Sequence, residues 1–538
     1  MNLIHDAWLP VIRSSGKKDK IAPWQIIEEE DPVIELNAPR PDFQGAFYQF
    51  LIGLLQTCFA PADHEEWLNY WETPPDEKVI QEYFQLMAPA FELHNKSGPS
   101  FMQDSGLSNL EPKGISDLLI EAPGEKTIRD NLDHFIKRDR ITHLCQPCAA
   151  TALFTLQLNA PTGGVGHRVG LRGGGPLTTL VMPADEEVLW RKLWLNVLDV
   201  ENFVDVIYQP SADVFPWMGQ IRVSDKGGVD TRPEDTHPLQ VYWGMPRRIK
   251  ILSSEDLHGT CDLCGDQKVI TIKEYLTQNY GVNYVGEWVH PLTPYRYDPK
   301  KEKPPISIKG QKGGLGYRHW ISLVLSHSKD ADHAAKVALV YMSERAHDIG
   351  SQRIARLWCF GYDMDKMKAR CWYDHTLPLF RLDDSQRENV LSWASDLINA
   401  AWEVSNNLRQ QVKAAWFRRP NDLKDKDEMN TLALEFWQRS ESDFYQLLSP
   451  LTKLPGDQRL APPEIYAAWV KRLQTLAYDL FDEWVLEGPA EDMDMQRIIA
   501  SRRELGRKLS SSKSMKDLIL KANMREEVKN AETALSIP

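Results

Sequence analysis

Residues 160–179 read APTGGVGHRVGLRGGGPLTT, a segment in which glycine recurs seven times, at positions 163, 164, 166, 170, 173, 174 and 175. His167, Arg168 and Arg172 lie between the glycines, and the segment contains no carboxylate. Glycine lets the backbone come close to a ligand because it has no Cβ, and exposed N–H groups beside arginines suit an anion such as phosphate. The segment predicts either a glycine-rich turn between two strands or a ligand-binding backbone surface. Arg168 and Arg172 are then phosphate contacts or internal struts.

The glycine segment does not match the nucleotide-binding loops. A P-loop requires Gly-Lys followed by Ser or Thr, and the segment has no lysine. A dinucleotide fingerprint requires G-x-G-x-x-G, whereas three residues separate Gly166 from Gly170 here. These departures argue against nucleotide hydrolysis and against NAD binding.

The length and composition are those of a globular protein with more than one domain. The chain has 538 residues, of which 42% are hydrophobic and 26% are charged. Its net charge of −13 argues against indiscriminate binding to nucleic acid, but a local basic patch can still serve such a ligand. The N-terminus, MNLIHDAWLPVI, lacks the features of a secretion signal, so we expect a cytoplasmic location with reduced cysteines.

Two regions of different character follow one another along the chain. Residues 1–383 read as a mixed α/β lobe in which strand-like and helical segments alternate between loops rich in glycine and proline. Residues 384–538 show long helical patterns with few glycines, interrupted at Pro420, at 455–463 and at Gly488–Pro489. We therefore predict an α+β fold, with a mixed N-terminal lobe followed by a helical bundle of the four-helix type.

Individual elements can be assigned within this division. Strands are expected at Leu177–Met182, Gln240–Trp243 and Val269–Ile272, and helices at Phe43–Phe59 and Ala334–Arg345. The helices expected in the bundle are Ser385–Phe417, Met429–Leu448, Pro463–Glu487, Met493–Ser510 and Met515–Ser536.

Two C-x-x-C pairs provide a candidate metal site. Cys145 and Cys148 form the first pair, and Cys261 and Cys264 form the second, with 112 residues between the pairs. Four thiolates make a closed tetrahedral zinc site, which is structural because it leaves no open coordination position. We therefore expect Zn²⁺ to join two distant segments; the alternatives are a redox-active pair or four thiols without a metal.

Two stretches of the chain carry a local excess of positive charge. Residues 497–525 contain nine Lys or Arg against two acids, and residues 296–318 contain seven against two. The cations expected to contact a nucleic-acid backbone are Lys300, Lys301, Lys303, Lys309, Lys312, Arg502, Arg503, Arg507 and Lys508. The alternative for each stretch is a solvated face or loop.

Motif searches give little support for catalysis. The sequence contains neither H-E-x-x-H nor G-x-S-x-G. Asp363 and Asp365, two residues apart in GYDMDKMK, resemble a metal-binding pair, but we expect them in a turn. Lys366, Met367 and Lys368 then lie at its exposed tip, with Met367 available as an apolar wedge.

Seven features occur in one order along the chain and resemble a known family. They are MNLIHDAWLPV at the start, Phe101-Met102-Gln103, the first cysteine pair running into ATALF, the glycine segment, CDLCG, Trp288–Pro291 and FGYDMDKMKARCW. Together they resemble the CasA family, the large subunit of the type I-E CRISPR Cascade complex. The likeness spans about residues 1–375, and the helical C-terminal region fits the family in length and type.

The resemblance implies a non-catalytic role in RNA-guided antiviral defence. A CasA-type subunit contacts the 5′ handle of the crRNA, reads a protospacer-adjacent motif in duplex DNA through the minor groove, and helps to open the duplex into an R-loop. It also recruits a separate helicase-nuclease. The implied partners are crRNA, double-stranded target DNA, the backbone subunits, a dimer of small subunits, the handle-binding subunit and the crRNA endonuclease subunit, with no membrane.

The resemblance also implies roles for particular residues. The motif-reading glycine loop falls on Thr162, Gly163, Gly164, Val165 and Gly166, with His167 beside it; the wedge falls on Asp365, Lys366 and Met367; and the handle loop contains Phe135, Lys137 and Arg138. Two positions depart from the family's pattern, because its lysine finger falls on Asn279 and a Gln or Asn of its wedge falls on Lys366. The preferred DNA motif therefore need not be the family's.

Two other functions fit part of the sequence. The first is a metal-dependent nuclease or hydrolase built around Asp363, Asp365 and zinc, which a closed four-thiolate site does not favour. The second is a zinc-stapled RNA-binding scaffold unconnected to CRISPR. Co-purification with a crRNA-bearing assembly distinguishes that scaffold from a Cascade subunit.

Overall fold

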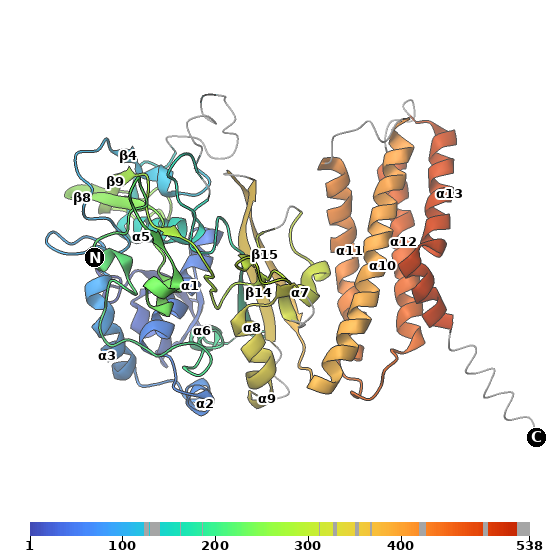
Figure 1. The fold of residues 1–538 in the computed structure, drawn as a ribbon, viewed down its shortest axis with the longest axis horizontal. Coiled ribbons are helices and arrows are strands. Elements are labelled where there is room, and N and C mark those ends of the chain that lie inside the picture. The colour runs from blue at the N-terminus through green and yellow to red at the C-terminus, as the bar shows by residue number, and fades with distance from the viewer. Residues whose placement is uncertain are drawn as a thin grey trace, which may run out of the picture. The chain divides into compact units, whose positions relative to one another are not determined.

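The computed structural model describes residues 1–122, 129, 140–161, 163–185, 187–310, 313–325, 331–349, 355–365, 368–418, 427–487 and 493–523. The chain divides into two compact units, which Figure 1 shows as ribbons coloured along the sequence. The first unit comprises Met1–Gly310 and Ser326–Pro378, and the second comprises Gln311–Leu325 and Leu379–Pro538. A short segment from within residues 1–383 therefore belongs to the second, largely helical unit.

The first unit mixes helices with short strands. Its helices are α1 (Pro41–Cys58), α2 (His64–Glu72), α3 (Glu77–Met87), α5 (Gln146–Asn159), α6 (Leu189–Trp194), α8 (Lys336–Val340) and α9 (Ala346–Asp348). Its strands are β1 (Leu9–Arg13), β2 (Lys18–Ile21), β3 (Val33–Leu36), β4 (Lys113–Gly114), β5 (Leu144–Cys145), β6 (Thr178–Pro183), β7 (Asp230–Thr231), β8 (Arg248–Gly259), β9 (Val269–Gln278), β10 (Asn283–Tyr284), β11 (Tyr295–Arg296), β12 (Ile306–Ser307), β13 (Asp332–His333), β14 (Ala355–Asp365) and β15 (Lys368–Leu379).

Three small antiparallel sheets position the features that the sequence singled out. Strand β1 lies between β2 and β3 near the N-terminus. Strand β14 lies between β6 and β15 and pairs with β6 from Ala355↔Pro183 to Phe360↔Thr178. Strand β9 pairs with β4, β5 and β8, and its register places Cys145 opposite Thr271. The glycine segment therefore leads from α5 into β6, and the first cysteine pair begins beside β9.

Helix α1 forms the centre of the first unit. All of its residues except Pro41 and Gln44 are buried, because the helix is apolar around its whole circumference. Its glycines allow close packing: a Cβ on Gly45 would lie 2.6 Å from the ring of Phe360. Buried Gln56 is satisfied on both sides, since its amide bonds the Leu198 carbonyl at 2.9 Å and accepts the Leu198 N–H at 2.8 Å.

The second unit is built around a bundle of long helices. These are α10 (Asp384–Trp416), α11 (Asp427–Leu451), α12 (Pro463–Leu486) and α13 (Met495–Ser511), with the short α7 (Trp320–Val324) in the same unit. Helix α10 packs against the other three long helices, and residues 513–523 are also helical. Polar caps define where α10 and α13 begin. Gln386 closes a capping box at Asp383 before α10, and the Asp494 side chain before α13 accepts the Arg497 N–H at 3.0 Å.

The structure confirms the predicted α+β fold class and corrects one strand. The strands at 177–182 and 269–272 and the other expected helices correspond to elements at those places, while Met515–Ser536 is helical as far as residue 523 and its remainder lies outside the described residues. Gln240–Trp243, expected as a strand, lies instead at a 3₁₀ turn over Pro238–Tyr242. Local contacts explain the difference, because Pro238 opens the turn, the Gln240 N–H donates to the His237 carbonyl at 2.9 Å, and the Gln240 side-chain amide donates to the Asp213 carbonyl at 2.8 Å. Within the described residues, no helix is both long and apolar enough to span a bilayer.

Candidate functional site

The glycine segment folds back on the end of α5. The N–H of Gly170 donates to the carbonyl of Ala160 at 3.1 Å, and the N–H of Gly175 donates to the carbonyl of Asn159 at 3.3 Å. Close packing requires glycine at position 170, because a Cβ there would lie 2.9 Å from the carbonyl oxygen of Leu158. These contacts close the segment into a loop whose outermost part is residues 163–167, which we call the glycine tip.

The glycine tip presents bare backbone. The His167 N–H donates to the Gly164 carbonyl at 3.1 Å and closes a turn around Val165, whose side chain is 79% exposed. A Cβ built on Gly164 meets no atom within 4 Å, so that residue borders open space. Gly166 has a φ of +76°, in the left-handed region that favours glycine.

Two residues that follow β9 support the glycine tip from beneath. The N–H of Tyr280 donates to the Gly166 carbonyl at 2.8 Å, and the side-chain amide of Asn279 donates to the Val165 carbonyl at 2.8 Å. A Cβ on Gly166 would lie 3.0 Å from both residues, so the packing leaves no room for one. The family resemblance assigned Asn279 to the DNA-reading site, and in the structure Asn279 contacts the glycine tip.

Arg247, just before β8, holds the base of the same loop. Its guanidinium donates to the Pro161 carbonyl at 2.5 Å and also to Nδ1 of His167. Burial, together with the charge of Arg247, lowers the pKa of His167. The ring is therefore neutral at pH 7, and because Nδ1 accepts from arginine, its proton lies on Nε2.

Sequence motifs did not identify Arg247 or Tyr280. No local pattern marks either residue, and only the pairing of β8 with β9 brings them together. Arg248 lies opposite Gln278 in that pairing, so the residues just outside the pair, Arg247 and Asn279, both reach the glycine segment. A reliable alignment of β8 with β9 is the signal that would have found them.

The structure resolves the two arginines of the segment as internal struts. Arg172 is 4% exposed and donates to the hydroxyls of Thr178 at 3.1 Å and Thr293 at 2.9 Å, and to the Gln49 amide oxygen at 2.6 Å. Arg168 donates to the hydroxyl of Ser224 at 2.7 Å and to its carbonyl at 2.8 Å. Both guanidinium groups thus fix the loop to the body of the unit.

Lys309 differs from the exposed phosphate contact that the sequence indicated. Its ammonium donates to the Arg172 carbonyl at 2.6 Å and to the Ser307 hydroxyl at 2.6 Å. Burial, with the charge of Arg172, lowers its pKa to about 7. Lys309 therefore acts within the fold, where it supports the second half of the glycine segment.

Asp363 and Asp365 lie in strand β14, not in the expected turn. Because alternate residues of a strand share a face, both carboxylates meet Arg370 of β15. Arg370 binds Asp363 through two hydrogen bonds of 2.8 and 2.7 Å and approaches Asp365 at 3.8 Å. This neutralisation removes the case for a metal pair. The hairpin packs on the glycine segment, since a Cβ on Gly175 would lie 2.6 Å from Met364.

The four cysteines of the two C-x-x-C pairs form a cluster. The sulfurs of Cys145, Cys148, Cys261 and Cys264 all lie within 4.8 Å of one another, and those of Cys145 and Cys264 are 3.6 Å apart. A tetrahedral zinc site with Zn–S bonds of about 2.3 Å separates its sulfurs by roughly 3.8 Å. The thiols therefore fit a four-coordinate metal ion. Hydrogen bonds from Cys145 and Cys148 lower the pKa of Cys261.

Polar contacts hold the two cysteine segments together beside the sulfurs. The Asp262 carboxylate accepts the N–H groups of Thr142 at 2.7 Å and His143 at 2.9 Å. Gly265, with a φ of +78°, donates its N–H to the Cys261 carbonyl at 3.0 Å and turns the second pair back on itself. The cluster thus joins residues 142–148 to residues 261–266.

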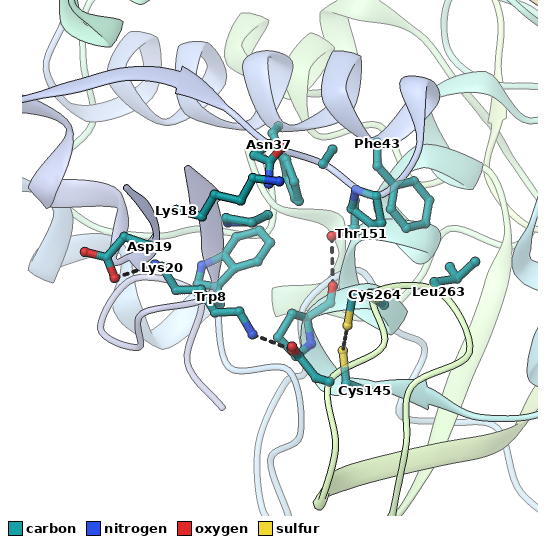
Figure 2. A pocket seen from close by; sticks show the side chains of 17 residues that line it. Trp8, Lys18, Asp19, Lys20, Asn37, Phe43, Cys145, Thr151, Leu263 and Cys264 are labelled. Carbon is teal, nitrogen blue, oxygen red and sulfur yellow. Dashed lines mark hydrogen bonds and ion pairs between the residues drawn. The ribbon is translucent and has the colours of Figure 1, made fainter. Parts of the chain in front are cut away.

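A cavity of about 740 Å³ borders the cluster, and Figure 2 shows Cys145 and Cys264 at its edge. The other walls come from β1, β2 and α1, including Trp8 and Phe43. The ammonium of Lys20 on β2 pairs with Asp266 of the second cysteine segment. The cavity provides a path by which a metal ion can reach the thiols.

The basic stretches contain both free and paired cations. Lys300, Lys301 and Lys303 are exposed, and no ion pair involves them in the described part of the chain. On α13, Arg502 binds Asp482 through two hydrogen bonds of 2.8 Å, and Arg507 binds Glu504 at 2.8 and 2.5 Å. Arg503 is exposed and Lys508 is half-buried, and neither forms an ion pair with another described residue.

Several predicted site residues lie outside the described residues. They are Phe135, Lys137 and Arg138 of the handle loop, Thr162 of the glycine loop, Lys312 of the basic stretch, and Lys366 and Met367 of the wedge.

Comparisons with known proteins identify a family model and solved structures that resemble this chain. A family model described as CRISPR-associated protein Cse1 matches residues 2–480. The solved CasA of Thermus thermophilus is 18% identical, with a TM-score of 0.68 over 95% of this chain and 99% of that chain. Cse1 from Acidimicrobium ferrooxidans is 15% identical, with a TM-score of 0.66 over 96% and 99%. A chain of a CRISPR RNA-guided surveillance complex is 13% identical, with a TM-score of 0.64 over 95% and 99%. These structures share the fold.

The substitution Lys309→Met should flatten the pH dependence of stability above pH 7. Folding lowers the pKa of Lys309 from about 10.4 to about 7, so the unfolded chain binds more protons between these values. The free energy of unfolding of the parent therefore rises with pH across this window, by up to about 1.4 kcal/mol per unit from this group, and falls as the pH drops toward 7. Urea unfolding at about pH 7 and about pH 9.5 measures both slopes. The same pH dependence of stability in the parent and in Lys309→Met would show that Lys309 is solvated and would contradict the prediction.

Proposed function

The chain belongs to the Cse1 (CasA) family of CRISPR-associated proteins, and from that premise we propose that it is the non-catalytic large subunit of an RNA-guided Cascade surveillance complex. In this role it recognises a protospacer-adjacent motif in duplex DNA through the minor groove and helps to open the duplex. The observation that carries the proposal is the glycine tip: Gly164 exposes backbone without a side chain, and Asn279 and Tyr280 hold the next two residues, Val165 and Gly166.

The glycine tip suits the minor groove for a steric reason. That groove is only about 6 Å wide in B-DNA and offers few distinguishing groups, so a reader must bring its hydrogen-bonding atoms close to the base edges. Gly164 places backbone at the surface with open space around its Cα, and Val165 projects beside it. Neutral His167 adds a ring N–H next to this backbone. Asn279 takes a supporting role, because one N–H of its amide binds the Val165 carbonyl.

The β14–β15 hairpin supports the opening of the duplex. In the sequence, Lys366 and Met367 follow Asp365, the last residue of β14, and precede Lys368, the first residue of β15. The pairing of Arg370 with Asp363 ties the strands together near that end, which stiffens an element that must push between base pairs. An apolar side chain such as Met367 is the kind that unstacks a base step. The same pairing disfavours a hydrolase that uses these aspartates to bind a metal.

The exposed cations provide phosphate contacts for the separated strands. Lys300, Lys301 and Lys303 lie in one loop, and Arg503 and Lys508 lie on α13. We expect these residues to outweigh Arg502 and Arg507, whose charges are already neutralised by Asp482 and Glu504.

The remaining contacts of the proposed role involve the rest of the assembly. Phe135, Lys137 and Arg138 contact the 5′ handle of the crRNA, the protein joins the other Cascade subunits, and it recruits the helicase-nuclease in trans once the R-loop has formed. The supporting observation is the family match, which covers residues 2–480 and therefore includes the handle segment. The protein acts in the cytoplasm.

The cysteine cluster is proposed to hold one structural Zn²⁺. Four thiolates saturate a tetrahedral ion, which then adds folding energy and leaves no position for a substrate. Cys145 begins α5, and Cys261 and Cys264 precede β9, so the bound ion would fix where these two elements start.

Replacement of one ligand should remove the metal. We expect Cys261→Ser to reduce bound zinc from about one ion per chain to a small fraction, and to lower the thermal midpoint by roughly 5–10 °C. Inductively coupled plasma mass spectrometry measures the zinc. Cys371→Ser is the matched control, because Cys371 lies on β15, outside the cluster. Equal zinc in the parent and in Cys261→Ser would refute the metal site.

The glycine tip should tolerate a larger side chain in folding but not in DNA recognition. Gly164 lies outside the left-handed region, and its Cβ would meet no atom within 4 Å, so Gly164→Leu should leave the thermal midpoint and crRNA content of the assembled complex unchanged. The added side chain holds the backbone away from the groove floor, so the Kd for a matched target duplex should rise at least about tenfold, with Gly164→Ala intermediate. An unchanged Kd for Gly164→Leu contradicts the proposed role.

A further inference from the structure

A pocket of about 220 Å³ lies in the second unit between α10, α11 and the segment 313–319. Residues spaced by three or four positions bring one face of each long helix to it. These residues are Trp402, Ser405 and Arg409 on α10, and Asn430, Leu434 and Trp437 on α11. The pocket is therefore built by two regular helices.

The lining of this pocket combines exposed aromatic surface with positive charge. Trp402 is 41% exposed, an unusual position for tryptophan, and its ring lies 5.1 Å from that of buried Trp437 at an angle of 65°. The described lining includes Arg318 and Arg409 and no carboxylate, although the protein has a net charge of −13. This chemistry excludes a cationic ligand and favours a flat group that bears an anion.

Arg409 is the arginine of this pocket whose side chain has no partner among the described residues. Its Nε is shielded from solvent and has no hydrogen-bond partner, and no ion pair involves Arg409 in the described part of the chain. On each of the other three long helices an arginine is paired with a carboxylate: Arg439 with Glu483, Arg472 with Asp443 and Arg502 with Asp482. Arg409 lines the pocket and its charge has no carboxylate partner there, so an anion that enters the pocket would meet an unneutralised guanidinium.

Arg318 lines the pocket while it makes contacts of its own within the protein. It donates to the carbonyl of Gly314 at 2.8 Å, and its guanidinium lies over the ring of Trp437 at 5.5 Å from the centroid. It thus holds Trp437 in place and adds positive potential beside Arg409 and Trp402.

We propose that this pocket binds one nucleotide of single-stranded nucleic acid, with its base stacked on Trp402 and its phosphate bonded to Arg409. The inference rests on the proposed function, because opening a duplex supplies the single strand. Stacking on an aromatic face together with an arginine is how proteins hold single strands without regard to sequence. The volume of about 220 Å³ suits a single base and is too small for a folded segment.

Binding of a labelled oligonucleotide to the full-length chain tests the pocket. The probe is a fluorescein-labelled oligothymidine of 12 nucleotides, and its binding is measured by fluorescence anisotropy at a fixed salt concentration. Trp402→Ala and Arg409→Gln should each raise the Kd about tenfold, and Trp402→Phe should stay within about threefold of the parent, since a stacking face remains. Lys471→Gln is the charge-matched control, because Lys471 is an exposed residue of α12 that does not line the pocket, and its effect should not exceed about twofold.

Photo-crosslinking locates the contact independently of affinity. An oligomer that carries 5-iodouracil should crosslink to the peptide of α10 that contains Trp402. Parent-like affinity of both Trp402→Ala and Arg409→Gln overturns the proposal, as do crosslinks confined to other elements. Displacement of the probe by an oligoglutamate peptide at lower concentration than by unlabelled oligothymidine also overturns it, in favour of an acidic protein segment. Thermal midpoints equal to that of the parent show that the variants fold.

The proposed function is tested separately from this pocket. Duplex binding by the assembled complex that carries Gly164→Leu reports on the glycine tip and does not depend on Arg409. A pocket that fails its test while Gly164→Leu still weakens duplex binding leaves the minor-groove role standing. Loss of oligothymidine binding in Arg409→Gln, with no effect of Gly164→Leu on the duplex, supports the pocket and contradicts the proposed motif readout.

Discussion

The clamp formed by the cysteine cluster is the constraint on which the candidate site depends. Helix α5 starts at the first cysteine pair and ends at the glycine segment, while β9 starts just after the second pair and ends at Asn279 and Tyr280. Both elements therefore run from the cluster toward the glycine tip. A second fastening lies near their far ends, where Gln157 and Arg247 exchange hydrogen bonds of 2.9 and 3.0 Å. Helix α5 and the β8–β9 pair are therefore held together both at the cluster and beside the tip.

The positively charged side chains near the glycine tip form hydrogen bonds within the protein. Arg168, Arg172, Arg247 and Lys309 all donate to carbonyls or side chains of the protein, so the tip itself presents backbone and a neutral histidine. Recognition by shape and backbone hydrogen bonds suits a groove with a degenerate code. In the proposed role, phosphate attraction falls to exposed cations elsewhere, which is consistent with a protein that is acidic overall.

The sequence was most informative where the chemistry is local. The C-x-x-C spacing predicted a four-cysteine cluster, and the helical periodicity predicted α10 to α13, because both depend on residues close together in the chain. Sequence-based prediction failed where the structure of a residue depends on partners far away in the chain. Lys309 looked like a free cation until the carbonyl of Arg172 was found beside it, and Asp363 looked like part of a turn until β14 was seen to pair with β6 and β15. Arg409 carried no signal, because its lack of a partner is a property of the folded helices.

Base analogues that alter one groove at a time test the central claim most directly. Inosine and 3-deazaadenine change the minor-groove edges of a base pair, whereas 7-deazaguanine and 7-deazaadenine change the major-groove edges. Each is placed in the duplex next to a matched target, and the affinity of the assembled complex is measured. Minor-groove analogues should weaken binding at the motif positions, and major-groove analogues should leave it unchanged. Sensitivity to the major-groove analogues alone would contradict recognition by the glycine tip.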